Sequence, residues 1–282
     1  MNRKNGVYLS RRDFLLLSGL GCGGMTAACA CGGLISALVL LSDQDSETPT
    51  PGITPSPTTV VQIPTATPDY RYPTMISRAE WGALQPNHAA VNETGFYSLD
   101  NPEGWRWYQE PLSDIYRTVV LHHSASYLLS DLMTIWDVQN THRNQRGWAD
   151  VAYHYFIGKN GDVYEGRDIH VRGTHVKGYN TGSVGVCLLG DFTTDYPTDP
   201  QIGATIGLVQ WLARELHLTH LASHRDFETT VCPGHNLIPY LDAFASHAGL
   251  ARGTGGYVMP PEQMEATETA AASACLCGHI HN

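Results

Sequence analysis

Short apolar runs rich in β-branched residues recur through the middle of the chain and predict buried strands. The runs at residues 118–121 and 183–189 have the length and composition of strands buried on both faces, and a shorter run ends at His224. A hairpin is predicted over residues 152–164, because its two apolar halves flank Asn160-Gly161, a pair that favours tight turns between strands. These runs together predict a sheet that is largely hidden from water.

Segments with helical spacing separate the apolar runs. Three helices are predicted in this way, over residues 130–143, 199–216 and 237–248. The first is capped by Ser130, and its apolar residues Leu132, Ile135 and Trp136 recur at helical spacing. The alternation of strands and helices indicates an α/β fold, with a central mixed β-sheet flanked by helices in a single domain over residues 74–250.

The N-terminal region, residues 1–42, is predicted to be a targeting segment. Its Ser10-Arg11-Arg12-Asp13-Phe14-Leu15 resembles the twin-arginine export signal, which places basic residues before an apolar run. That run, residues 14–41, has 28 residues and exceeds the about 20 that cross a hydrocarbon core. Three outcomes stay open, namely cleavage, lipidation of a cysteine, or retention as a helix, and we favour an anchor of some form.

Residues 43–73 are predicted to be a linker rich in threonine and proline. Repeats such as Thr48-Pro49-Thr50-Pro51 disfavour helix and central strand, because proline has no amide hydrogen to donate. Segments of this kind extend as semi-rigid stalks. We therefore expect an exported chain whose domain is secreted or is held beyond the outer face of the cytoplasmic membrane.

Charge and cysteine content argue against two classes of protein. The chain has 17 basic and 27 acidic residues, a net charge of −10, and no dense Lys/Arg cluster, so nucleic acid is not an expected partner. Of seven cysteines, only Cys187 and Cys232 fall in the predicted domain. One pair makes no disulfide framework, so burial or a metal must hold the domain together. Cys187 lies in an apolar run and is expected to be a small core residue.

Three residues combine metal-binding chemistry with a rigid position in the predicted fold. His122 and His224 lie at the ends of predicted strands, and Cys232 precedes Pro233-Gly234. Zinc prefers imidazole and thiolate, and a catalytic zinc site has three protein ligands and one open position. Adjacent side chains of a strand point to opposite faces, so only one of His122 and His123 should reach a metal.

A series of ordered segments runs through the predicted domain. It comprises residues 76–83, 120–125, 142–154, 163–167, 175–180, 183–192 and 224–234. Among them are Val120-Leu121-His122-His123-Ser124-Ala125 and His224-Arg225-Asp226, followed by Cys232-Pro233-Gly234. In residues and in order, the series resembles the peptidoglycan recognition proteins and the phage lysozyme-type N-acetylmuramoyl-L-alanine amidases. The resemblance implies cleavage of the amide between N-acetylmuramic acid and L-alanine in peptidoglycan.

The resemblance also implies a catalytic zinc ion (Zn2+) and the residues around it. It makes His122, His224 and Cys232 the zinc ligands, the last two eight residues apart as in the family. Zinc lowers the pKa of its water to about 7 and polarises a carbonyl. Tyr153 aligns with the family's catalytic tyrosine, a donor to the oxyanion. Thr230 stands where the phage enzymes carry lysine and eukaryotic amidases commonly have threonine, so it is a second catalytic candidate.

Further residues of the series are candidates for contact with substrate. Trp148 is suited to stack on a sugar or to pack in the domain, and His175 and Asn180 match a loop that borders the family's groove. His142 is equally suited to packing and to supporting the site. Glu165 is expected to stabilise the hairpin rather than to act as a base.

Two stretches depart from the pattern of the family. Residues 84–116 are longer than compact members need. A wall of the groove and a contact with glycan are alternatives for this stretch, but its Trp105, Trp107 and Tyr108 are expected to pack within a surface loop. Residues 251–282 have no counterpart and are expected to form a disordered tail. The end of this tail alternates potential metal ligands, namely Cys275, Cys277, His279 and His281.

The leading interpretation is therefore an exported zinc amidase, and two alternatives stand beside it. The first is a non-catalytic module that recognises peptidoglycan, and the second is a unit that tethers the wall. Non-catalytic members typically lack the cysteine ligand, whereas this chain has Cys232 with both histidines and Tyr153. The expected partner is peptidoglycan or its muropeptide fragments, a membrane is reached only through residues 1–42, and the domain is expected to be a monomer.

Overall fold

A computed structural model describes residues 73–257 of the chain. The predicted targeting segment, the predicted linker up to residue 72 and residues 258–282 of the predicted tail lie outside the described residues. Within residues 73–257, no helix has the length and apolar character that crossing a membrane would require.

A mixed β-sheet forms the centre of the described part, and this confirms the predicted fold class. Seven strands are described there, β1 (Met75–Ile76), β2 (Thr118–His123), β3 (Tyr155–Ile157), β4 (Val163–Glu165), β5 (Ser183–Leu188), β6 (His220–Ser223) and β7 (Ala251–Arg252). Their order is β1-β4-β3-β5-β2-β6-β7, and every neighbouring pair is parallel except the antiparallel pair β3–β4. The antiparallel pair is the predicted hairpin. β7 belongs to the stretch that the sequence assigned to the tail.

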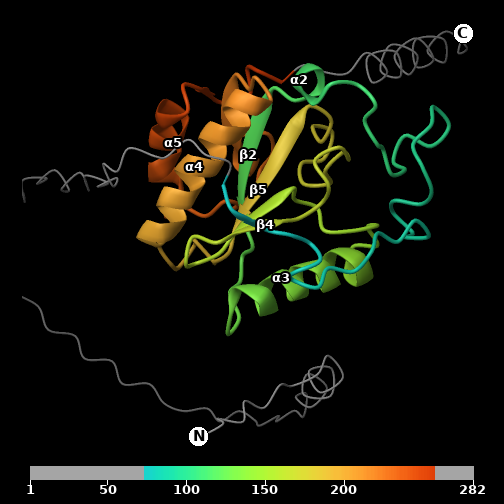
Figure 1. Ribbon diagram of the computed structural model, residues 1–282, viewed down its shortest axis with the longest axis horizontal. Coiled ribbons are helices and arrows are strands. Elements are labelled where there is room, and N and C mark those ends of the chain that lie inside the picture. The colour runs from blue at the N-terminus through green and yellow to red at the C-terminus, as the bar shows by residue number, and fades with distance from the viewer. Residues whose placement is uncertain (1–72, 258–282) are drawn as a thin grey trace, which may run out of the picture. The chain divides into compact units, whose positions relative to one another are not determined.

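Helices cover both faces of this sheet (Figure 1). The helical segments are α2 (Leu112–Ile115), α3 (Asp131–Asn140), the π-helical η1 (Thr141–Gln145), α4 (Asp199–Glu215), the 3-10 turns η2 (His224–Asp226) and η3 (Ile238–Tyr240), and α5 (Leu241–His247). α4 and α5 pack on one face, and α3 packs on the other. The three predicted helices are thus present, the first extended by η1 and the last divided between η3 and α5.

The apolar residues that recur at helical spacing in α3 are not all buried. Ile135 is buried, but Leu132 and Trp136 are 36% and 37% exposed. Thr134 and Gln139 are buried instead, because their side chains bond backbone groups of neighbouring loops. The helix therefore packs partly on loop backbone, which needs polar partners, and apolar spacing alone does not identify that face.

Side chains alternate along β2, so His122 and His123 point to opposite faces of the sheet. Val119 and Leu121 belong to the core under α4 and α5. His122 stands opposite Cys187 in register, and Cys187 packs in the cluster beneath α3. His123 points the other way and accepts a hydrogen bond from the Phe192 amide at 3.2 Å. The two histidines therefore point to opposite faces as predicted, and the core position of Cys187 is also confirmed.

Candidate metal centre

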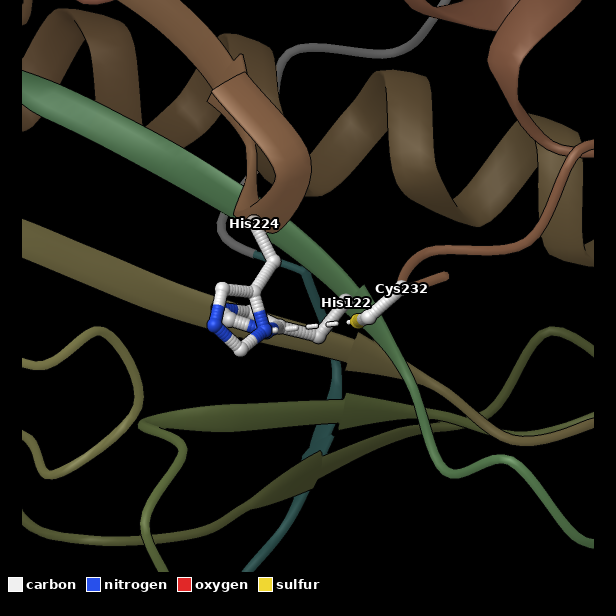
Figure 2. A group of neighbouring side chains, drawn as sticks. All are labelled: His122, His224 and Cys232. Atoms are coloured by element: carbon white, nitrogen blue, oxygen red, sulfur yellow. Dashed lines mark hydrogen bonds between the residues drawn. The ribbon is translucent and has the colours of Figure 1, made fainter. Parts of the chain in front are cut away.

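His122, His224 and Cys232 converge at the carboxyl ends of β2 and β6, where their potential ligand atoms all lie within 4.8 Å of one another (Figure 2). His122 is the second-last residue of β2, His224 directly follows β6, and Cys232 lies in the loop beyond η2. Among residues 73–257 no other group of His, Cys, Asp and Glu side chains meets the same geometric test. The three residues that the sequence singled out are therefore brought together.

The donor set and its spacing fit a tetrahedral zinc ion. The Cys232 sulfur lies 3.6 Å from Nδ1 of His122. Zinc–sulfur and zinc–nitrogen bonds of about 2.3 and 2.0 Å at a tetrahedral angle separate the two donors by about 3.5 Å. Burial raises the pKa of the Cys232 thiol to about 12, so binding of a cation has to displace the thiol proton. The three residues are thus positioned to hold a metal.

A buried chain of hydrogen bonds supports His122. Its Nε2 lies 3.0 Å from Nδ1 of His175, and Nε2 of His175 lies 3.3 Å from the Ser183 carbonyl oxygen. The carbonyl can only accept, so Nε2–H of His175 donates to it and Nδ1 of His175 accepts from Nε2–H of His122. This order leaves the Nδ1 lone pair of His122 for the metal. Gly173 and Gly185 make room for the His175 ring, since a Cβ at either would lie 2.7 Å or less from it.

Burial keeps both rings of this chain neutral. It lowers the pKa of His122 well below its ordinary value, and the neighbouring imidazoles lower it further. The pKa of His175 is also lowered well below its ordinary value, first by burial and then by His154. A neutral imidazole has one donor and one acceptor nitrogen, which is what the relay from Ser183 to the metal position needs.

The other two ligands lie nearer to solvent and have different partners. Nε2 of His224 lies 2.5 Å from a carboxylate oxygen of Glu228, whose side chain is 45% exposed. The Cys232 amide donates to Oγ1 of Thr230 at 3.2 Å. Glu228 was not singled out from the sequence, although its spacing of four residues from His224 was a visible signal.

Tyr153 stands beside the metal position, just before β3. Its ring centroid lies 5.0 Å from that of His122, 5.4 Å from that of His142 and 5.8 Å from that of Phe156. Burial raises the pKa of Tyr153 well above its ordinary value, so its hydroxyl keeps its proton and can donate. Nδ1 of His142 accepts the Ala152 amide at 3.1 Å, which holds the segment leading to Tyr153.

A groove of about 1090 Å³ opens over these residues. The predicted site residues that line it are Trp148, Tyr153, His175, Asn180, His224, Thr230 and Cys232, while His122 lies fully buried beneath. The Asn180 side-chain oxygen accepts the amides of His175 and Val176, which leaves its NH2 group for other partners. Three basic residues also line the groove and were missed from the sequence, because nothing in their spacing sets them apart: Arg146, Arg172 and Lys177.

The long stretch over residues 84–116 supplies part of one wall of this groove. Its Glu93 and Glu103 line the hollow, and Glu93 forms a buried ion pair with Arg167. Trp105 is buried against the Arg167 guanidinium, 4.8 Å from the ring centroid, whereas Trp107 is 49% exposed. The stretch is thus a packed loop rather than a loose insertion.

Several known proteins are similar to this chain in sequence and in fold. The family described as N-acetylmuramoyl-L-alanine amidase matches residues 112–235. The chain is 32% identical over 171 residues to peptidoglycan-recognition protein SC2 of Drosophila melanogaster, covering 58% of this chain and 82% of that protein. It is 36% identical over 126 residues to an endolysin of Klebsiella phage KP32, covering 42% and 81%. The solved structure of wild-type Drosophila PGRP-LB is similar, with a TM-score of 0.50 at 26% identity, covering 64% of this chain and 97% of that one.

Proposed function

The chain belongs to the family of peptidoglycan recognition proteins and N-acetylmuramoyl-L-alanine amidases, and from this membership we propose that it hydrolyses the amide between N-acetylmuramic acid and L-alanine in peptidoglycan. The observation that carries the proposal is the convergence of His122, His224 and Cys232 under an open groove. Zinc is the proposed cofactor. When bound, it supplies Lewis acidity that lowers the pKa of water to near neutral and polarises a carbonyl.

The proposed catalytic side chains are Tyr153 and Thr230. The Tyr153 hydroxyl is protonated at neutral pH and donates a hydrogen bond to the oxygen on which negative charge develops. Thr230 accepts the Cys232 amide with its oxygen, so its hydroxyl hydrogen is available to the groove. As a neutral group it orients the leaving amine rather than supplying it with a charge.

Substrate contact is proposed for Trp148, His175 and Asn180. The half-buried Trp148 ring offers a flat face to a sugar, and the Asn180 NH2 group can donate to a peptide carbonyl. Both nitrogens of His175 face the protein, so only its ring edge is left to line the groove. The substrate lies outside the cytoplasmic membrane, which agrees with the export predicted from residues 1–42.

Release of free amino groups from purified peptidoglycan tests the proposal. The full-length chain is incubated with zinc, with a chelator, and as the Cys232→Ala variant. We expect new L-alanyl amino groups without new reducing sugar ends, and only with zinc and Cys232 both present. A folded, zinc-loaded protein that sediments with peptidoglycan but releases no amine from several wall types would instead be a recognition module.

A further inference from the structure

The two histidines of the metal centre have outer partners of different chemistry. Nε2 of His122 meets the neutral, buried ring of His175 at 3.0 Å. Nε2 of His224 meets the carboxylate of Glu228 at 2.5 Å, where the two side chains are 20% and 45% exposed. The Glu228 contact is the shorter of the two, and it is the one that brings a negative charge to the centre.

The backbone places Glu228 against His224. A helical turn begins at His224, and the amides of Phe227 and Glu228 both donate to the His224 carbonyl, at 3.1 and 3.4 Å. Phe227 anchors the turn, because its ring packs on Tyr179 and Tyr257 with centroids 4.8 and 6.3 Å away. Two residues that are four apart in a helical turn place their side chains one above the other, so the contact between His224 and Glu228 follows from the local fold.

We propose that Glu228 is a positioning residue for the metal. Its carboxylate accepts Nε2–H of His224, which holds this imidazole in the tautomer that leaves the Nδ1 lone pair for the ion. Hydrogen bonds of this kind orient a histidine ligand and raise its basicity, and their loss weakens metal affinity by about 10–100-fold. The inference rests on the proposed zinc role of the centre.

Two other roles for Glu228 agree less well with the geometry. If Glu228 were a direct ligand, its carboxylate oxygen would lie among the converging ligand atoms. That group consists of His122, His224 and Cys232 and does not include Glu228. A partly exposed pair that only supported folding would leave zinc affinity unchanged. Metal affinity therefore separates positioning from surface pairing.

The test is the zinc dissociation constant of the full-length chain, measured by competition with a chelator of known affinity. Glu228→Ala is expected to bind zinc about 10–100-fold more weakly than the wild type. Glu228→Gln is expected to recover part of the loss, because its amide oxygen still accepts from Nε2–H. Glu215→Ala is the matched control, since its carboxylate is 48% exposed and lies outside the groove lining.

A spectroscopic signature complements the affinities. Long-range nitrogen–hydrogen correlation spectra of the imidazoles report the tautomer, and His224 is expected to carry its proton on Nε2 in the wild type and to lose this preference in metal-free Glu228→Ala. The inference is overturned if Glu228→Ala binds zinc within about twofold of the wild type, or if His224 carries its proton on Nδ1 in the wild type. Either outcome leaves the amidase proposal unaffected. If the wild type binds zinc but releases no amine, and Glu228→Ala binds zinc more weakly than the wild type, the inference is supported and the amidase proposal is overturned.

Discussion

The metal centre consists of two halves that are supported in different ways. In the inner half, His122 ends a fully buried strand and is bonded through His175 to the Ser183 carbonyl in the next strand. In the outer half, His224 and Cys232 lie on the chain that follows β6, with Glu228 as a half-exposed partner. One half is part of the core, and the other is attached to its rim.

This difference separates metal affinity from folding. Every donor and acceptor of the inner half is buried, so a missing partner there costs the folded state about 1–3 kcal/mol. Water can replace a missing partner in the outer half, so the loss of that partner lowers mainly the affinity for the metal and not the free energy of unfolding. The comparison predicts that inner variants lose stability together with affinity, whereas outer variants lose mainly affinity.

Removal of one ligand from each half is expected to have the largest effect. His122→Ala and Cys232→Ala should each abolish amine release and weaken zinc binding well beyond the about 100-fold that loss of an outer partner costs. His122→Ala should also lower the free energy of unfolding of the metal-free protein by more than Cys232→Ala does, because it leaves His175 Nδ1 without a donor, whereas Cys232→Ala removes only the weak thiol contact with Nδ1 of His122. Zinc competition and urea unfolding measure the two effects. Equal stability of both variants would contradict the division into halves.

Acid is expected to act on the inner half with the next largest effect. Burial lowers the pKa of His154, which packs against His175, to about 4. The unfolded chain takes up this proton near pH 6.5, so the stability contributed by neutral His154 is complete above pH 6.5 and is lost as pH falls towards 4. The loss amounts to about 3 kcal/mol.

Urea unfolding of the metal-free protein between pH 7.5 and 4.5 measures this dependence. His154→Gln is expected to have a shallower slope of stability against pH than the wild type. His247→Gln, at the exposed end of α5, serves as the control and should keep the wild-type slope. A slope that is unchanged in His154→Gln would show that other groups carry the acid sensitivity.

Removal of the hydrogen-bond partner of each histidine ligand, His175 or Glu228, is expected to have the smallest and most discriminating effect. In the metal-free protein, His175→Ala should lower the free energy of unfolding by about 2 kcal/mol, because it leaves the buried Nε2–H of His122 unpaired. Glu228→Ala should lower it by less than about 1 kcal/mol, since the pair is partly exposed. Both changes weaken zinc binding. Equal losses of stability would show that the rim is as tightly coupled to folding as the core.

Local pattern accounted for much of the fold. β2, β5 and the hairpin β3–β4 follow from apolar runs and from Asn160-Gly161, and the start of α3 follows from Ser130, whose side chain accepts the Met133 amide. The apolar spacing of α3 did not by itself identify its buried face, because Leu132 and Trp136 are partly exposed. Spacing shows which residues share a face of a helix, but the partner of that face decides what it must contain.

The sequence by itself determined the kinds of element, the family and the three residues that converge at the centre. Those properties depend on short-range spacing and on residue identity, both of which are read directly from the chain. Only the tertiary structure decided that Ser183 and His175 support His122 and that residues 84–116 line the groove. Hydrogen bonds and burial between segments far apart in the chain depend on how the sheet aligns them, and this alignment has no local signal.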